Sequence, residues 1–333
     1  MQRRFKELLM MCVVCLMLGY TNHRQQEFKF HEVKFRQVLR LSVGSKEGQV
    51  FIKVQPNREV IVPRLLPPDA EGNFWIVGEA KGGIMRVKRT GESVTVLRQL
   101  SYGLPSVNSS GHLAIHVCKG EGYNYTDEIR IYNPSGQILA TFTVKGCPIC
   151  KHPYLHYLAG IDDQQRIWLQ FLSTDRSVEE QPKRTACIVA FDLQGRVVRH
   201  IEGVWGLSAG HLLHRTKSIG GSFIILNPEN MSTSEVPVPL GWDGLFVGMD
   251  SLREIIWWDC WRLDNINIKA LMAFGKQGIV AMLPRPYKFL GGEDGKKVLS
   301  SEPVIGADGR LYVAQCIEES FYIFEANMSF LKQ

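Results

Sequence analysis

The 333-residue chain lacks the features that would indicate a membrane, nucleic-acid-binding or helical protein. After residue 20 it has no apolar run long enough to cross a bilayer. Lysine and arginine are scattered rather than clustered and give a net charge of only +6, which argues against a nucleic-acid surface. No segment keeps a helical period over a convincing length. Nucleophile elbows, phosphate-binding glycine loops and paired catalytic carboxylates at recognisable spacing are also missing, so no familiar reaction class is indicated.

The N-terminus has the pattern of a secretory signal. Arg3, Arg4 and Lys6 form a basic start, and residues 8–20 follow without a charge. This run is short for a membrane span and fits the apolar part of a signal peptide. We therefore expect residues 1–21 to be removed during export to the periplasm or the extracellular space. An uncleaved apolar segment that tethers the protein to the membrane is the alternative.

The remaining sequence contains a repeated pattern of turns and strands. A turn rich in Asp, Asn and Gly precedes an apolar strand at six places, which begin at Asp69, Asn108, Asp162, Ser208, Asp250 and Ala307. The residues just before these strands are 39, 54, 45, 43 and 56 positions apart, close to the roughly 40–50 residues of a four-stranded propeller blade. Over residues 28–333 the pattern predicts an all-β fold, a six-bladed β-propeller of four-stranded antiparallel blades.

The last blade needs a strand from the other end of the chain. Little sequence remains after the strands at residues 311–314 and 321–324, whereas residues 32–41 form a strand without a blade of its own. We expect residues 32–41 to be the outer strand of the sixth blade, because this pairing closes the ring and removes the open sheet edge. A closed ring of this kind is expected to be a monomer.

Three segments of the repeat resemble a known class of propeller. DAEGNFWIV at Asp69, IRIYNPSG at Ile129 and ADGRLYVA at Ala307 are similar to the repeats of NHL and gluconolactonase-like (TolB-like) six-bladed propellers. The resemblance covers nearly the whole mature chain and implies the fold. It implies little about activity, because these motifs are architectural and many functions share them.

One further segment resembles the metal site of the gluconolactonase-like family. WDGLFVGMD, at residues 242–250, is similar to the segment that places an aspartate at the axial channel, which implies Asp243 as a metal ligand. The family's glutamate would fall near residues 62–63 and its asparagine near residues 204–205, and neither residue type stands there. A hard cation needs several oxygen donors. We therefore expect Asp243 to cap the turn before its strand rather than to hold calcium or zinc.

A cysteine- and histidine-containing segment follows the second blade. Cys147, Cys150, His152 and His156 have plausible zinc-ligand spacing, and Cys-x-x-Cys also serves redox chemistry. Lys151 occupies the position where haem attachment would require a histidine. In an exported protein a structural disulfide is the commoner role of cysteine, so we favour a disulfide over a metal or redox site.

The cysteines after the signal all fall on one face of the predicted propeller. They lie at the ends of second strands, at the start of a third strand and in the loop after the second blade: Cys118, Cys147, Cys150, Cys187, Cys260 and Cys316. We expect at least one disulfide on this face, formed by Cys147 or Cys150. Its partner would be Cys187 or Cys118, because the loop lies between their two blades. A thiolate metal site that uses Cys147, Cys150 and His152 is the competing interpretation.

Tryptophans form the last candidate group. Trp257 and Trp258 are adjacent in a strand, so their side chains face opposite ways and one is expected to pack between blades. Trp261 follows in the connection on the cysteine-bearing face, where an exposed indole could stack on a sugar or a peptide. Core packing is the alternative for each of the three.

Together these observations predict an exported, non-catalytic binding or scaffold propeller whose loop-rich face takes a protein, a glycan or a small molecule. Asp243, Trp261, His152 and His156 are the candidate residues of that face. We expect no nucleic-acid partner, no resident cofactor (calcium and zinc being the ions to test) and membrane contact only through an uncleaved N-terminal segment. A divergent metal-dependent lactonase or hydrolase of the gluconolactonase-like type is the alternative.

Overall fold

The structure is a computed structural model that describes residues 34–328 with internal gaps. These gaps are at 47, 52, 55–59, 62, 79–82, 98–104, 122–123, 148–153, 175–183, 218–219, 285–297 and 318. The predicted signal at residues 1–21 lies outside the described residues. Among the described residues, no helix has the length and apolar character needed to cross a membrane.

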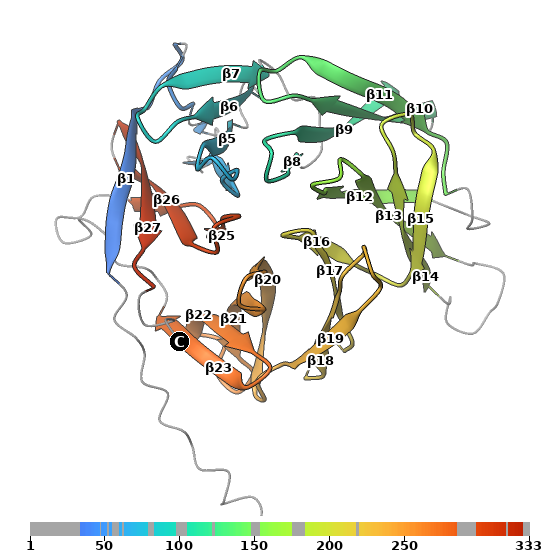
Figure 1. Cartoon of the computed structure of the whole chain (residues 1–333). Coiled ribbons are helices and arrows are strands. Elements are labelled where there is room, and N and C mark those ends of the chain that lie inside the picture. Colours follow the sequence, from blue (N-terminus) through green and yellow to red (C-terminus); the bar gives the residue numbers. More distant parts are fainter. Residues whose placement is uncertain are drawn as a thin grey trace, which may run out of the picture.

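Six antiparallel sheets stand around a central axis, and each sheet is one blade of a β-propeller (Figure 1). From the axis outward, the first blade is β4 (Arg64–Leu66), β5 (Phe74–Gly78), β6 (Gly83–Val87) and β7 (Ser93–Leu97). The second is β8 (Ser106–Val107), β9 (Leu113–Glu121), β10 (Asn124–Tyr132) and β11 (Ile138–Val144). The third is β12 (Tyr154–Ile161), β13 (Ile167–Thr174), β14 (Arg184–Phe191) and β15 (Val197–Glu202).

The fourth and fifth blades repeat the same order. The fourth is β16 (Gly206–Ser208), β17 (His211–Arg215), β18 (Ser222–Leu226) and β19 (Thr233–Pro237). The fifth is β20 (Trp242–Asp250), β21 (Ile255–Arg262), β22 (Lys269–Gly275) and β23 (Gly278–Pro284). The all-β, six-bladed propeller predicted from the repeat is confirmed.

The sixth blade joins the two ends of the described chain. It contains β24 (Val298–Ser300), β25 (Val304–Ile305), β26 (Leu311–Ile317) and β27 (Ser320–Ala326), and its outer strand is β1 (Phe35–Ser42). β1 runs antiparallel to β27, from the pair Phe35–Ala326 to the pair Ser42–Ser320. The prediction that an N-terminal strand closes the ring is therefore confirmed, with the strand at 35–42 rather than 32–41.

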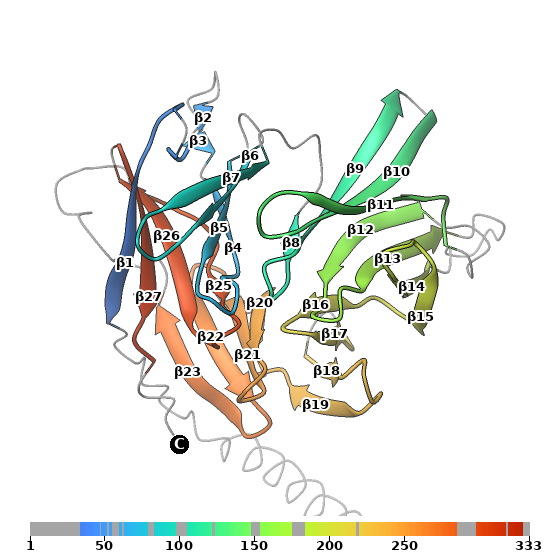
Figure 2. The ribbon, with the colours of Figure 1, turned by 45° about the horizontal axis from the view of Figure 1, so that its top comes forward.

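A short hairpin interrupts the path from β1 to the first blade. β2 (Lys53–Val54) pairs with β3 (Val60–Ile61) in a two-stranded sheet outside the six blades. Figure 2 shows this hairpin on the same side of the ring as the far ends of β9 and β10. This side is the face on which the second strand of each blade ends and the third begins, and we call it the hairpin face.

Apolar side chains that alternate along the strands pack the blades against one another. In β21, Trp258 lies in a cluster with Phe223 of the fourth blade, and Trp257 lies in a cluster with Ile305 and Leu311 of the sixth. Both indoles are fully buried. The prediction that one of them packs between blades thus holds for both, because the fifth blade is covered on its two faces by different neighbours.

The turns that mark the blades are held by buried carboxylates. Asp162 accepts hydrogen bonds from the Arg166 amide at 2.8 Å, the Arg166 Nε at 2.7 Å and the Trp168 indole at 2.8 Å. Asp69 accepts from the Asn73 amide at 2.9 Å and the Trp75 indole at 3.4 Å in the same way. In the first and third blades the sequence mark therefore corresponds to a local turn whose aspartate fixes the strand that follows, and Asn108 accepts from the His112 amide at the same place in the second blade.

Successive turns are also linked to one another around the axis. The Ala70 amide of the first blade donates to the Ser109 carbonyl of the second at 2.7 Å. The Ser109 amide in turn donates to Asp163 of the third at 3.0 Å, and Asn108 Nδ2 donates to the Asp162 carbonyl at 2.9 Å. These bonds set the spacing of three neighbouring blades at the axis.

Glu325 on β27 links the strands and blades that meet where the ring closes. Its carboxylate accepts from Arg36 of β1 at 3.4 Å, from Arg89 of the first blade at 3.2 Å and from Arg310 of its own blade at 2.8 Å. The Glu325 side chain is only 10% exposed, so these three guanidinium groups are its main polar partners.

Candidate functional site

A cavity lies at the axis of the propeller, which is the first place to look for a ligand. Polar side chains that line it form hydrogen bonds between neighbouring blades. The cavity has a volume of about 580 Å³ and is lined by residues of all six blades. Ser106 Oγ accepts a hydrogen bond from the Ile161 amide of the next blade at 3.3 Å, and Ser208 Oγ accepts from the Met249 amide at 3.1 Å. These lining groups have a structural role between neighbouring blades.

Asp243, implied as an axial metal ligand and expected to cap the turn before its strand, lies inside β20 and forms an ion pair instead. Its Oδ1 accepts from the Arg215 guanidinium and from the Gly244 amide, both at 2.8 Å. The same guanidinium lies over the Trp258 ring, 5.0 Å from its centroid. Asp243 therefore joins β20 to β17 of the preceding blade. It is paired across the strands with Trp261, whose side chain is partly buried. Trp261 therefore lies within β21 and not, as predicted, in the connection that follows the strand.

The histidines of the cysteine-rich segment are only partly described. His156 is exposed on β12, and its ring meets Tyr157 edge-on with centroids 5.1 Å apart. His152 and Cys150 lie outside the described residues, so the zinc interpretation of this segment stays a prediction.

The described cysteines lie toward the hairpin face, and two of them are adjacent. Cys147 and Cys187 are both buried, and their Sγ atoms are 3.5 Å apart. That separation exceeds a sulfur–sulfur bond, and no disulfide joins cysteines in the described part of the chain. Burial raises the pKa of Cys316 to about 12, which makes this thiol unreactive at neutral pH.

A second group on this face combines three different metal-ligating side chains. His116 and Cys118 are two residues apart on β9, and Asp127 stands opposite Cys118 on β10. His116 Nε2 is 2.7 Å from Asp127 Oδ1, and Cys118 Sγ is 3.6 Å from each of these two atoms. Cys118 is exposed, and partial burial together with the Asp127 carboxylate raises the pKa of its thiol. We call these residues the His–Cys–Asp cluster.

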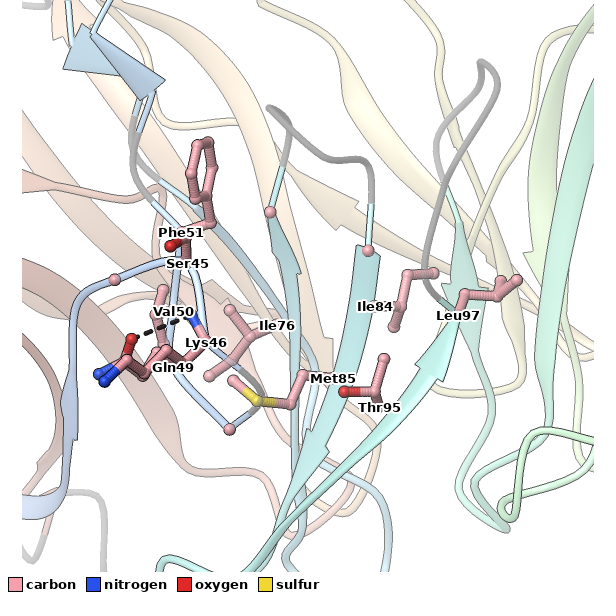
Figure 3. Close-up of a pocket in the computed structure, with 14 residues that line it drawn as sticks. Ser45, Lys46, Gln49, Val50, Phe51, Ile76, Ile84, Met85, Thr95 and Leu97 are labelled. Atoms are coloured by element: carbon pink, nitrogen blue, oxygen red, sulfur yellow. Dashed lines mark hydrogen bonds between the residues drawn. The ribbon is translucent and has the colours of Figure 1, made fainter.

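An apolar pocket lies at the hairpin face of the first blade (Figure 3). Its volume is about 410 Å³, within the usual range of roughly 300–1,000 Å³ for small-molecule sites. Ile76 and Met85 of the blade and Val50 of the preceding loop form apolar walls. Gln49 and Thr95 add polar groups. The combination suits a ligand with an apolar body and a polar edge.

The loop that forms one side of this pocket is folded by its own hydrogen bonds. The Gly44 amide donates to the Val50 carbonyl at 2.9 Å, and the Lys46 amide donates to Gln49 Oε1 at 3.1 Å. Val50 is only 2% exposed and belongs to the core shared by the first and sixth blades. The wall is therefore held by contacts within the chain, which lowers the entropic cost of binding.

The pocket is not among the residues predicted from sequence, and of the His–Cys–Asp cluster the sequence predicts only Cys118, as a candidate for a disulfide or a metal site. The pocket could have been suspected from the long connection between the N-terminal strand and the first turn mark at Asp69, because loops of that length are uncommon without a role. His116 and Cys118 share a face of one strand. Only the register of the hairpin, however, brings Asp127 to them.

Comparison with known proteins supports the fold but gives no evidence about function. No protein-family model matches the chain, and no curated protein sequence matches it. A DUF4221-family protein from Bacteroides vulgatus is 14% identical with a TM-score of 0.51, over 90% of this chain and 99% of that one. Virginiamycin B lyase from Staphylococcus aureus is 12% identical with a TM-score of 0.42, over 88% and 99% of the two chains. A gluconolactonase from Xanthomonas campestris is 10% identical with a TM-score of 0.44, over 80% and 87%.

The similarity to the DUF4221-family protein is one of overall fold. At such identities a shared fold carries no activity with it.

Proposed function

We propose that this protein is a non-catalytic propeller that binds a small molecule with an apolar body in the pocket of the first blade. The observation that carries the proposal is the preformed pocket itself, with walls formed by Val50, Ile76 and Met85 and polar groups from Gln49 and Thr95. Apolar walls with a few placed polar groups are typical of small-molecule sites.

The chemistry at the axis favours binding over the lactonase alternative. Asp243 is engaged by Arg215, and Ser106 and Ser208 are engaged by amides of neighbouring blades. Asp243, the one residue that the gluconolactonase resemblance implies, and the two serines of the axial cavity thus join neighbouring blades. Accordingly, hydrolysis of an aldonolactone above the buffer rate, with or without added calcium, would contradict a non-catalytic role.

The pocket is tested by filling it. Thr95 stands opposite Met85 across β6 and β7 and lines the pocket, whereas Val94, the preceding residue, is 45% exposed. We expect the full-length protein to bind the apolar fluorophore anilinonaphthalene sulfonate with saturation at one equivalent. Thr95→Trp should weaken this binding at least tenfold, and the matched variant Val94→Trp should leave it unchanged. Equal binding by both variants would place the fluorophore elsewhere and contradict the proposal.

We further propose that the protein acts outside the cytoplasm as a monomer. The basic start and short apolar run of residues 1–21 support export, and pairing of β1 with β27 gives the sixth blade its outer strand within one chain. N-terminal sequencing of the cell-derived protein, together with its mass in solution, tests both statements. A cytoplasmic product that retains Met1 would contradict export.

A further inference from the structure

The structure assigns a second site, independent of the apolar pocket: we propose that His116, Cys118 and Asp127 bind one transition-metal ion of the zinc type. The three residues belong to a single hairpin, β9–β10, whose strands are paired in register from Leu113 to Glu121. Their ligand atoms all lie within 4.8 Å of one another. Imidazole, thiolate and carboxylate are the donors that proteins use for zinc.

The distances agree with the edges of a coordination tetrahedron. For ordinary zinc bond lengths, a sulfur ligand lies about 3.6 Å from a nitrogen or oxygen ligand of the same ion. Cys118 Sγ is 3.6 Å from both His116 Nε2 and Asp127 Oδ1. The remaining edge, His116 Nε2 to Asp127 Oδ1, is 2.7 Å and hydrogen-bonded, and it needs to open to about 3.4 Å. A metal ion that replaces the bridging proton would have this effect.

The same geometry argues against the other chemistry that these residue types suggest. In a nucleophilic triad the histidine contacts the nucleophile through one ring nitrogen and the carboxylate through the other. Here His116 turns Nε2 toward both Cys118 and Asp127. The three side chains converge on one point in space, as ligands do, rather than forming a relay.

Charge and accessibility also suit a divalent cation. With the thiol deprotonated, Cys118 and Asp127 supply two negative charges and His116 a neutral donor, which balances the ion. The nearby charges Lys119 and Glu128 occupy the alternate positions of the two strands and pair with each other at 2.6 Å. Because Cys118 is exposed, solvent reaches the cluster, and we expect water or a donor atom of a ligand to complete the coordination.

Cobalt(II) is the probe for this site, because a thiolate bound to tetrahedral cobalt gives a charge-transfer absorption and intense visible bands. The reduced, chelator-treated full-length protein should develop both signals and saturate at one equivalent. Cys118→Ser should remove the charge-transfer absorption. His116→Gln and Asp127→Asn should each weaken binding by roughly tenfold or more, since even residues behind the ligands change affinity by that factor.

Cys147→Ser and His156→Gln are the matched controls, because they remove a thiol and an imidazole from elsewhere in the molecule. Both should bind cobalt as the parent protein does, and the thermal transition of each variant shows that it is folded. Loss of the charge-transfer signal in Cys147→Ser with retention in Cys118→Ser would overturn the assignment. So would a spectrum of six-coordinate cobalt, or no thiolate signal at saturating metal.

Discussion

Identical turns at two places in the third blade show how burial decides what one carboxylate contributes. Asp162 and Asp192 each accept hydrogen bonds from the amide and the Nε of an arginine four residues later, at 2.7–2.9 Å. Asp162 is 2% exposed and also accepts from the Trp168 indole. The Asp192 turn lies at the outer edge of the blade, and Arg196 is largely exposed there. The two turns differ in environment rather than in local geometry.

We predict that Asp162→Ala lowers the free energy of unfolding by about 2–4 kcal/mol, because it leaves the buried Trp168 indole and the Arg166 Nε without their acceptor. Asp192→Ala should have a much smaller effect, since water replaces the lost carboxylate. Denaturant unfolding of the two variants measures the difference. Equal losses would mean that the local turn, and not its burial, is what stabilises the blade.

The adjacent thiols of Cys147 and Cys187 lead to a second prediction at this scale. We expect oxidised glutathione to convert them to a disulfide: the two thiols give up two protons and two electrons, and the oxidant leaves as two reduced glutathione molecules. Their Sγ atoms are 3.5 Å apart and need only a small approach. The bond should stabilise the fold by about 2–4 kcal/mol.

Mass spectrometry of non-reduced peptides identifies the pair. A linked Cys147–Cys187 peptide is the expected product, whereas Cys316, whose pKa burial raises to about 12, should remain a thiol. A bridge that contains Cys118 in place of Cys187 would contradict the prediction.

The turn before the second strand of a blade contains a residue with positive φ. The second blade has a glycine at this position, and the third blade has a glutamine. Gly111 has φ +76° three residues after Asn108, and Gln165 has φ +59° three residues after Asp162. A side chain costs about 1–2 kcal/mol in this conformation. A Cβ on Gly111 would also stand 3.3 Å from Asp69 Oδ2 and Pro134 Cγ.

We therefore predict opposite effects from two exchanges. Gly111→Ala should lower the free energy of unfolding by about 1–2 kcal/mol, through backbone conformation and close contact. Gln165→Gly should leave it unchanged or raise it by up to about 1 kcal/mol, because relief of the backbone offsets the added freedom of the unfolded chain. Thermal unfolding of both variants measures these effects. A clearly lower free energy of unfolding for Gln165→Gly would contradict the prediction for that variant.

Elements whose structure is local could be predicted from the sequence, and elements that depend on register could not. Asp69 and Asp162 repeat because each fixes its own turn, so the blades were countable. The His–Cys–Asp cluster depends on which residue of β10 faces Cys118, and a shift of one position would send Asp127 to the other side of the sheet. The pocket of the first blade depends on the loop around Val50, which has no repeat to compare it with.

At the scale of the whole molecule, ion pairs as well as strand pairing stabilise the junction of β1 with β27, where the ring closes. Glu325 meets Arg36 from the beginning of the described chain and Arg89 from the first blade. We predict that Glu325→Ala lowers the free energy of unfolding by about 2–3 kcal/mol, because the three arginines around it lose a nearly buried partner.

Glu302→Ala is the control for this prediction. Its ion pair with Arg64 is 3.5 Å long and exposed on both sides, so its loss should cost about 0–1 kcal/mol. Both variants are compared by thermal unfolding at low and high salt. If Glu325→Ala lowers the free energy of unfolding no more than the control does, strand pairing between β1 and β27 alone stabilises the ring closure.

The pairing of β1 with β27 also sets the order in which the molecule can assemble. Phe35 and its partner Ala326 are separated by almost the whole described chain, so this contact has one of the largest sequence separations in it. Contacts of such separation carry the highest loop-closure entropy and form late in folding. Until then β27 has an exposed edge that can pair with another chain. Folding yield should therefore be limited by this last step, and linking the two ends directly, with new termini in a turn between blades, would make closure local.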